Sequence, residues 1–131
     1  MFELEGIDHV ALAVPDLEQS AAWFSDVLGF ERLHRGLWNG VPIFLGKGTT
    51  ALALFPGRDG QASGSLPQGE SNEGAMLHLA MRADRKNFLA AQEELRNRGI
   101  KFEFQDHEIS HSIYFRNPDG FRLEITTYEL A

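Results

Sequence analysis

Two stretches of the chain decide its fold: Gly6-Ile-Asp-His-Val-Ala-Leu-Ala-Val14 and Ala75-Met-Leu-His-Leu-Ala-Met81. Each is a short, mostly apolar run, which predicts a buried strand. Each is followed by an aspartate that can cap a helix, then by apolar residues at helical spacing, and then by a glycine that can end the helix. The same order of signals in both halves indicates that one structural unit occurs twice.

The spacing of these landmarks is the same throughout. His9 lies 69 residues before His78, Asp16 lies 68 before Asp84, and Gly29 lies 70 before Gly99. After each predicted helix come short strand-like runs: Phe30–Leu37, Val41–Leu45 and Ala51–Phe55 in the first half, and Lys101–Phe104, Ile109–Arg116 and Phe121–Thr127 in the second. Asn39-Gly40, between two of these runs, predicts a hairpin turn.

These elements predict an α+β fold of two βαβββ modules. We expect module one at residues 1–56, a linker at residues 57–74 and module two at residues 75–131, together forming one domain over residues 1–131. The linker is rich in Gly, Ser, Gln and Pro, which is typical of a plain connector, and a loop that closes over a site is the alternative. If the modules pack about a pseudo-twofold axis, His9 and His78 converge on one point.

Composition excludes several classes of function. The chain has 131 residues, of which 43% are hydrophobic, with no cysteine and a net charge of −7. The lack of cysteine rules out disulfides and thiolate nucleophiles. An acidic chain without a basic run is not expected to bind nucleic acid. No stretch reaches the roughly 18 apolar residues of a membrane span. The first ten residues carry acids where a signal peptide has a basic flank, so we expect a cytoplasmic protein.

Three residues form a candidate metal site. A histidine alone on an apolar strand is most often a hydrogen-bonded core residue. His9 and His78, however, occupy the same place in a repeat. Glu124 lies in the middle of the last predicted strand, where a carboxylate is costly without a partner, although a surface pair with Arg122 is the alternative. Two histidines and one carboxylate leave open positions on a divalent metal, as non-heme Fe(II) sites do.

The sequence resembles the vicinal oxygen chelate superfamily, which includes glyoxalase, bleomycin-resistance proteins and extradiol dioxygenases. The segments that carry this resemblance are Gly6-Ile-Asp-His-Val-Ala-Leu12, Phe24 through Phe30, His78-Leu-Ala80 and Ser112-Ile-Tyr-Phe-Arg-Asn-Pro-Asp-Gly-Phe-Arg-Leu-Glu124. The resemblance implies a curved mixed sheet of paired βαβββ modules around a divalent metal held by His9, His78 and Glu124. It implies Fe(II) or Mn(II), with Ni(II) or Zn(II) as the alternatives.

The sequence lacks one metal ligand of glyoxalase-type members, and this limits the reactions that the resemblance allows. Glyoxalase-type members have a fourth ligand, Glu or Gln, which by the repeat offset falls near Ala53 or Leu54. No Asp, Glu or Gln occurs between Glu31 and Asp59. A three-ligand site speaks against glyoxalase chemistry. It fits a ring-cleaving dioxygenase acting on a catechol, or a metal-dependent thiol transferase that inactivates antibiotics. A metal-dependent isomerase stays open beside the transferase as the alternative to the dioxygenase. A non-catalytic drug-binding or metabolite-binding protein is a third class.

The resemblance to ring-cleaving dioxygenases also implies catalytic residues. Tyr114, ten residues before Glu124, would bond a substrate oxygen, and His107 or His111 would act as the acid and base. The alternative is that Tyr114 is a packed strand aromatic and that both histidines lie on a hairpin surface.

The remaining expectations concern substrate and partners. Trp38, Phe44 and His34 are expected on strands of module one and are candidate walls for an apolar small-molecule substrate. The resemblance implies a homodimer, and it leaves open whether the metal site lies within one chain or is shared by two.

Overall fold

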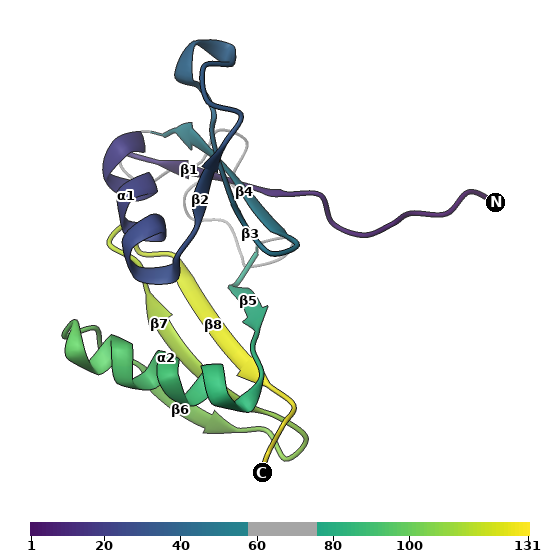
Figure 1. Cartoon of the computed structure of the whole chain (residues 1–131), viewed down its shortest axis with the longest axis vertical. Coiled ribbons are helices and arrows are strands. Elements are labelled where there is room, and N and C mark those ends of the chain that lie inside the picture. The colour runs from purple at the N-terminus through teal and green to yellow at the C-terminus, as the bar shows by residue number, and fades with distance from the viewer. Residues whose placement is uncertain (58–75) are drawn as a thin grey trace, which may run out of the picture. The chain divides into compact units, whose positions relative to one another are not determined.

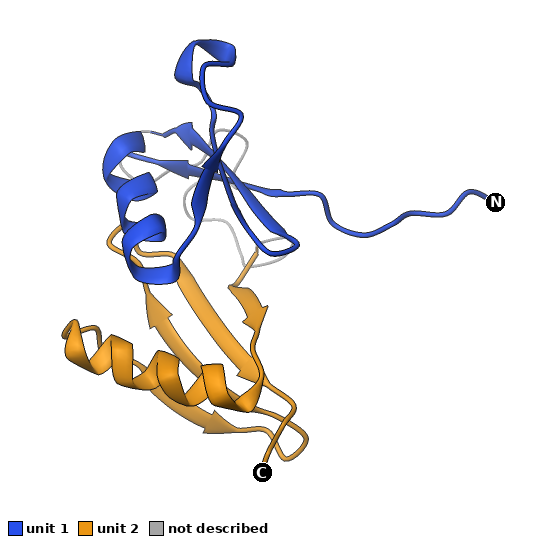
Figure 2. Cartoon of the chain, viewed as in Figure 1, with its two compact units in different colours: residues 1–65 blue, residues 66–131 orange. Residues whose placement is uncertain are grey.

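The computed structural model describes residues 1–57 and 76–131 (Figure 1). The chain forms two compact units, residues 1–65 and 66–131, and each is described by itself (Figure 2). Apart from Gly57, the predicted linker at residues 57–74 lies outside the described residues. The alternative that this segment closes over a site therefore stays a prediction. Of the helices in the described ranges, neither is long and apolar enough to cross a membrane.

The first unit is a βαβββ module. Its elements are β1 (Val10–Val14), α1 (Leu17–Leu28), β2 (Glu31–Leu33), the short 3-10 turn η1 (Trp38–Gly40), β3 (Ile43–Lys47) and β4 (Thr50–Pro56). The sheet order is β1-β4-β3-β2. Strand β1 runs parallel to β4, and the other pairs are antiparallel.

The second unit repeats this topology. Its elements are β5 (Leu79–Arg82), α2 (Arg85–Asn97), β6 (Glu103–Asp106), β7 (His111–Arg116) and β8 (Arg122–Thr127). The sheet order is β5-β8-β7-β6, with β5 parallel to β8 and the other pairs antiparallel. The predicted α+β fold of two βαβββ modules is confirmed.

Both helices begin at the predicted aspartates. The Asp16 carboxylate accepts a hydrogen bond from the Gln19 backbone N–H at 3.0 Å, and Asp84 accepts one from the Asn87 N–H at 2.8 Å. Each bond satisfies a backbone donor that the first helical turn leaves free. Helix α1 ends at Gly29, whose φ of 76° is a left-handed conformation that a residue with a side chain rarely adopts.

One face of each sheet packs on its own helix. In the first unit Phe24 of α1 is buried with the β3 and β4 leucines Leu45, Leu52 and Leu54. In the second unit Phe88 of α2 is buried with Ile113 and Leu123. Because side chains alternate along a strand, the residues between these core positions lie on the other face of each sheet. This other face, called here the open face, carries Glu124 and Tyr114 in the second unit and Phe44 in the first.

Several strand bounds differ from the predictions by about two residues, and two differences bear on the candidate site. Strands β1 and β5 begin at Val10 and Leu79, so His9 and His78 each lie directly before a strand rather than within it. The second difference is the connection between β2 and β3, which runs over residues 34–42 and is called here the β2–β3 arm (Figure 1). Asn39 and Gly40 do turn the chain, but with φ of 53° and 83° they lie within this longer arm and not in a two-residue hairpin loop.

Candidate functional site

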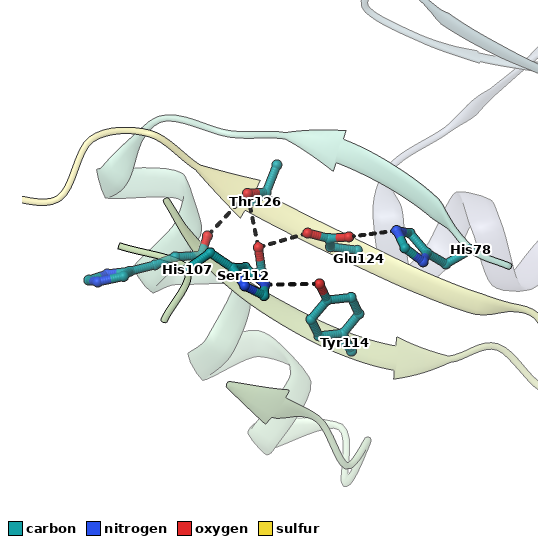
Figure 3. A network of polar contacts seen from close by, with 7 residues as sticks. His78, His107, Ser112, Tyr114, Glu124 and Thr126 are labelled. Carbon is teal, nitrogen blue, oxygen red and sulfur yellow. Dashed lines mark hydrogen bonds and ion pairs between the residues drawn. The ribbon is translucent and has the colours of Figure 1, made fainter. Parts of the chain in front are cut away.

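His78 and Glu124 meet on the open face of the second sheet. Strand β8 places Glu124 opposite Ala80 of β5, and His78 lies two residues before Ala80, on the same side of the pleat. The His78 Nε2 atom is 3.0 Å from Glu124 Oε1. Glu124 is only 7% exposed, a costly place for a charge unless it is paired. The imidazole provides that pairing (Figure 3). The His78 side chain is itself about one-third exposed.

One hydroxyl group binds the other oxygen of this carboxylate, and a second hydroxyl group contacts the first. Ser112, which is fully buried on β7, donates from Oγ to Glu124 Oε2 at 2.7 Å. Thr126 Oγ1 lies 3.0 Å from Ser112 Oγ and 3.3 Å from the carbonyl oxygen of His111. Because the Ser112 proton goes to the carboxylate, the Thr126 proton is left for one of these two oxygens. Both oxygens of Glu124 are therefore bonded, and its orientation is restricted (Figure 3).

Tyr114 lies beside this pair. The β7–β8 register places it opposite Glu124, and its ring meets the His78 ring edge-on at 5.8 Å. His107 Nε2 is 3.1 Å from the Tyr114 hydroxyl, and the Arg122 guanidinium lies 4.2 Å from the centre of the Tyr114 ring. Desolvation raises the pKa of Tyr114 above its usual value, and the charge of Glu124 raises it further, against smaller opposing effects of Arg122 and Ser112. At neutral pH this phenol is protonated and can donate a hydrogen bond.

The side chain of His111 is not brought to this group. His111 and Ser112 are neighbours on β7, so their side chains point to opposite faces of the sheet. The His111 ring packs edge-on against Phe104 at 5.2 Å, and its Nε2 is 3.7 Å from Asp106, too far for a hydrogen bond. Of the two histidines predicted as acid and base, His107 is the one placed against Tyr114.

His9 belongs to the first unit. Its Nδ1 is 2.8 Å from the Asp8 carboxylate, and its ring meets Phe44 edge-on at 5.0 Å. A carboxylate on one ring nitrogen fixes which nitrogen carries the proton and leaves the other free as an acceptor. Within the described part of each unit, no three His, Asp or Glu side chains gather as metal ligands. The role of His9 in a shared metal site therefore stays a prediction.

Strand register identifies the residue at the fourth-ligand position. Leu79 pairs with Leu123 in the second unit, as Val10 pairs with Leu52 in the first. One residue further along, Ala80 is opposite Glu124, and Ala11 is opposite Ala53. Ala53 thus occupies the place of Glu124, and a methyl group cannot bind a metal.

The same comparison matches Phe44 with Tyr114. Phe44 is opposite Ala53 in β3, as Tyr114 is opposite Glu124 in β7. The equivalent rows of the two open faces therefore differ in chemistry. One row is apolar and the other is ionic and hydrogen-bonded.

The three predicted wall residues lie together in the first unit. Ring centres are 5.7 Å apart for His34 and Trp38, 5.3 Å for His34 and Phe44, and 5.8 Å for Trp38 and Phe44. We call these three residues the aromatic cluster. Through Phe44 the cluster also touches His9. Trp38 is half exposed, so the cluster presents an aromatic surface to solvent.

Sequence reasoning missed Ser112 and Thr126. The signal that could have found them is alternation, since Ser112 shares a strand face with Tyr114, and Thr126 shares one with Glu124.

The contacts of Glu124 bear on whether a divalent metal suits the site. An imidazole nitrogen and a carboxylate oxygen 3.0 Å apart, the carboxylate further hydrogen-bonded from behind, form a donor pair of the kind that first-row divalent metals bind. The residues present fit such an ion.

Comparison with known proteins places this geometry among relatives. A family model described as the Glyoxalase/Bleomycin resistance protein/Dioxygenase superfamily matches residues 6–125. The glutathione transferase FosA of Serratia marcescens is 29% identical over 129 residues, which cover 98% of this chain and 84% of that protein. The mitochondrial methylmalonyl-CoA epimerase of Homo sapiens is 31% identical over 77% of this chain and 58% of its own length.

Two further similarities widen the range. The ring-cleaving dioxygenase candidate MhqA of Bacillus subtilis is 28% identical over 96% of this chain, which spans 40% of that protein. A crystal structure of a glyoxalase/dioxygenase from Nostoc punctiforme superposes with a TM-score of 0.72 at 24% identity, covering 94% of this chain and 90% of that one. The relatives share the fold but carry names of different reactions.

We expect Ser112→Ala to lower the free energy of unfolding by about 1–3 kcal/mol, because a buried oxygen of Glu124 loses its hydrogen-bond donor. Urea unfolding of the metal-free protein measures this. The matched comparison is the same substitution in a Glu124→Leu background, where no carboxylate remains to be satisfied and the cost should shrink. An equal cost in both backgrounds would show that the hydroxyl does not act through Glu124.

Proposed function

The chain belongs to the glyoxalase/bleomycin resistance protein/dioxygenase superfamily, and we propose that it is a metal-dependent enzyme acting on a small molecule. His78 and Glu124 would hold the metal, with His9 as the third ligand. The observation that carries this proposal is the His78–Glu124 pair, 3.0 Å apart, with the buried carboxylate oriented by Ser112. Fe(II) or Mn(II) is the favoured ion, and Ni(II) or Zn(II) is the alternative.

A divalent ion with open positions supplies a Lewis acid toward neighbouring oxygens of the substrate. The protein's own residues do the rest. Ser112 keeps Glu124 in one orientation, which limits the reorganisation needed on binding. Tyr114, protonated at neutral pH, donates a hydrogen bond to a substrate oxygen. His107, 3.1 Å from that hydroxyl, accepts and returns a proton at Nε2.

The reaction we propose is extradiol-type cleavage of a catechol, with dioxygen as the second substrate. Two observations support it over the alternatives. The His107–Tyr114 contact provides a proton-transfer pair beside the candidate ligands. The aromatic cluster of His34, Trp38 and Phe44 offers a surface against which an aromatic ring can pack. The similarity to MhqA points in the same direction.

A thiol transferase is the second candidate, and a specific observation favours it. The similarity to FosA covers 98% of this chain and 84% of FosA. In this case the same residues would bind an epoxide, whose ring opens when a thiolate attacks carbon and the oxygen takes a proton. An isomerase of the glyoxalase type is disfavoured, because Ala53 occupies the place of its fourth ligand.

Loss of metal binding tests the ligand set. We expect Glu124→Ala, His78→Ala and His9→Ala each to weaken Mn2+ binding at least about 100-fold, since each removes a donor atom. Isothermal titration of chelator-treated protein measures the affinity. His111→Gln is the matched control, because this histidine lies on the other face of the sheet. The Mn2+ affinity of this variant should equal that of the wild type. Unchanged Mn2+ stoichiometry and affinity in Glu124→Ala would refute the proposed site.

Turnover assays distinguish the two reactions. Protein reconstituted with Fe(II) or Mn(II) should consume oxygen with a catechol and should not consume glutathione with an epoxide. Tyr114→Phe and His107→Gln should lower kcat by about 100-fold or more, because each removes a group that transfers or positions a proton. Tyr128→Phe, which alters an exposed tyrosine, is the control. Thiol loss without oxygen uptake would establish the transferase instead.

A further inference from the structure

The β2–β3 arm encloses a small pocket beside the aromatic cluster. The pocket has a volume of about 140 Å³ and is lined by His34 and Phe44 of the cluster, by Leu37, and by Arg32 and Arg35. A space of this size accepts a terminal group of a ligand rather than a whole molecule. The ring of that ligand would lie on the cluster outside it.

The charge of this pocket is positive, in contrast to the rest of the first unit. No aspartate or glutamate is among its lining residues. Residues 1–57 contain seven Asp or Glu but only three Lys or Arg, namely Arg32, Arg35 and Lys47. Two of the three basic residues therefore line one pocket in an otherwise acidic region. A negative group is the ligand such a place favours.

The two arginines are not equivalent. Arg32 forms an ion pair with Glu18, so a carboxylate of the protein already neutralises its charge. For Arg35 no such ion pair exists with any residue in the described ranges. Arg35 also borders a second hollow, of about 330 Å³, but Glu18 and Glu31 line that one and would repel an anion. An anion that pairs with Arg35 is therefore more favourable on the side of the aromatic cluster.

The backbone of the arm is held in an uncommon conformation. His34, Trp38 and Asn39 have φ of 55°, 55° and 53°. In the described ranges only Glu108 shares this property among residues other than glycine. A left-handed backbone is unfavourable for a residue as large as Trp, and such residues gather at ligand sites. Here the conformation brings Trp38 to 5.8 Å from Phe44, next to the pocket.

We propose that the β2–β3 arm selects substrates that carry a carboxylate on an aromatic ring. Arg35 pairs with the carboxylate inside the pocket, and the aromatic cluster packs against the ring. The inference rests on the proposed function, since it names the class of substrate that the proposed enzyme would take. Arg35 is then a specificity-determining residue that acts on binding and leaves the chemistry to the metal ligands.

The test uses Trp38 as a built-in reporter and needs no metal. The chain has two tryptophans, so Trp23→Phe leaves Trp38 alone. Chelator-treated protein is titrated with benzoate, phenylacetate and 3-phenylpropionate, each beside its neutral amide, while Trp38 fluorescence is followed. We expect at least one acid to bind about tenfold or more tightly than its amide. Arg35→Gln should abolish that preference, Arg35→Lys should keep part of it, and Arg96→Gln in the second unit should keep all of it.

Equal affinity for acid and amide, a preference that survives Arg35→Gln, or no saturable binding of any acid would overturn the proposal. If Trp23→Phe does not fold, saturation-transfer NMR on wild-type protein and Arg35→Gln measures the same preference. Failure here leaves Mn2+ binding by His78 and Glu124 untouched. Failure of metal binding leaves the titration with aromatic acids untouched, so the two proposals can fail separately.

Discussion

A buried carboxylate in the middle of a β-strand governs the second unit. Glu124 is held among apolar neighbours on β8, and leaving its charge unpaired there would cost several kcal/mol. The imidazole of His78 pairs with one carboxylate oxygen, and the hydroxyl of Ser112 donates a hydrogen bond to the other. Tyr114 in turn takes its raised pKa from desolvation and from the same carboxylate. One buried charge therefore interacts with a histidine, a serine and a tyrosine on one sheet face.

The repeated scaffold carries two different chemistries. Both units hold a histidine directly before their first strand and pack the same sheet face on a helix. In the row that follows, Glu124 and Tyr114 of the second unit correspond to Ala53 and Phe44 of the first. The backbone supplies equivalent positions, and the side chains differ in chemistry, with an ion pair in the second unit and an apolar surface in the first.

Most of the fold could be predicted, because it depends on local signals. The sequence alone predicts the aspartate caps, the glycine at the end of α1 and the common offset of about 70 residues between the repeats. Other features depend on tertiary contacts. The Asn39-Gly40 signal indicates a turn but not the nine-residue arm around it. The gap between His107 and His111 does not reveal that only His107 is folded back against Tyr114, by a tight turn in which its N–H bonds the Ser110 carbonyl at 2.9 Å. Alternation places Ser112 on the same strand face as Tyr114, but it does not reveal the hydrogen bond to Glu124, because that contact depends on how β7 pairs with β8.

The proposed metal site needs one histidine from each repeat. Pulsed EPR of Cu2+-loaded protein counts the imidazoles bound to the ion. We predict two imidazoles in the wild type and one in either His9→Ala or His78→Ala. A single imidazole in the wild type that persists in His9→Ala would contradict the account, since the first unit would then contribute nothing to the metal.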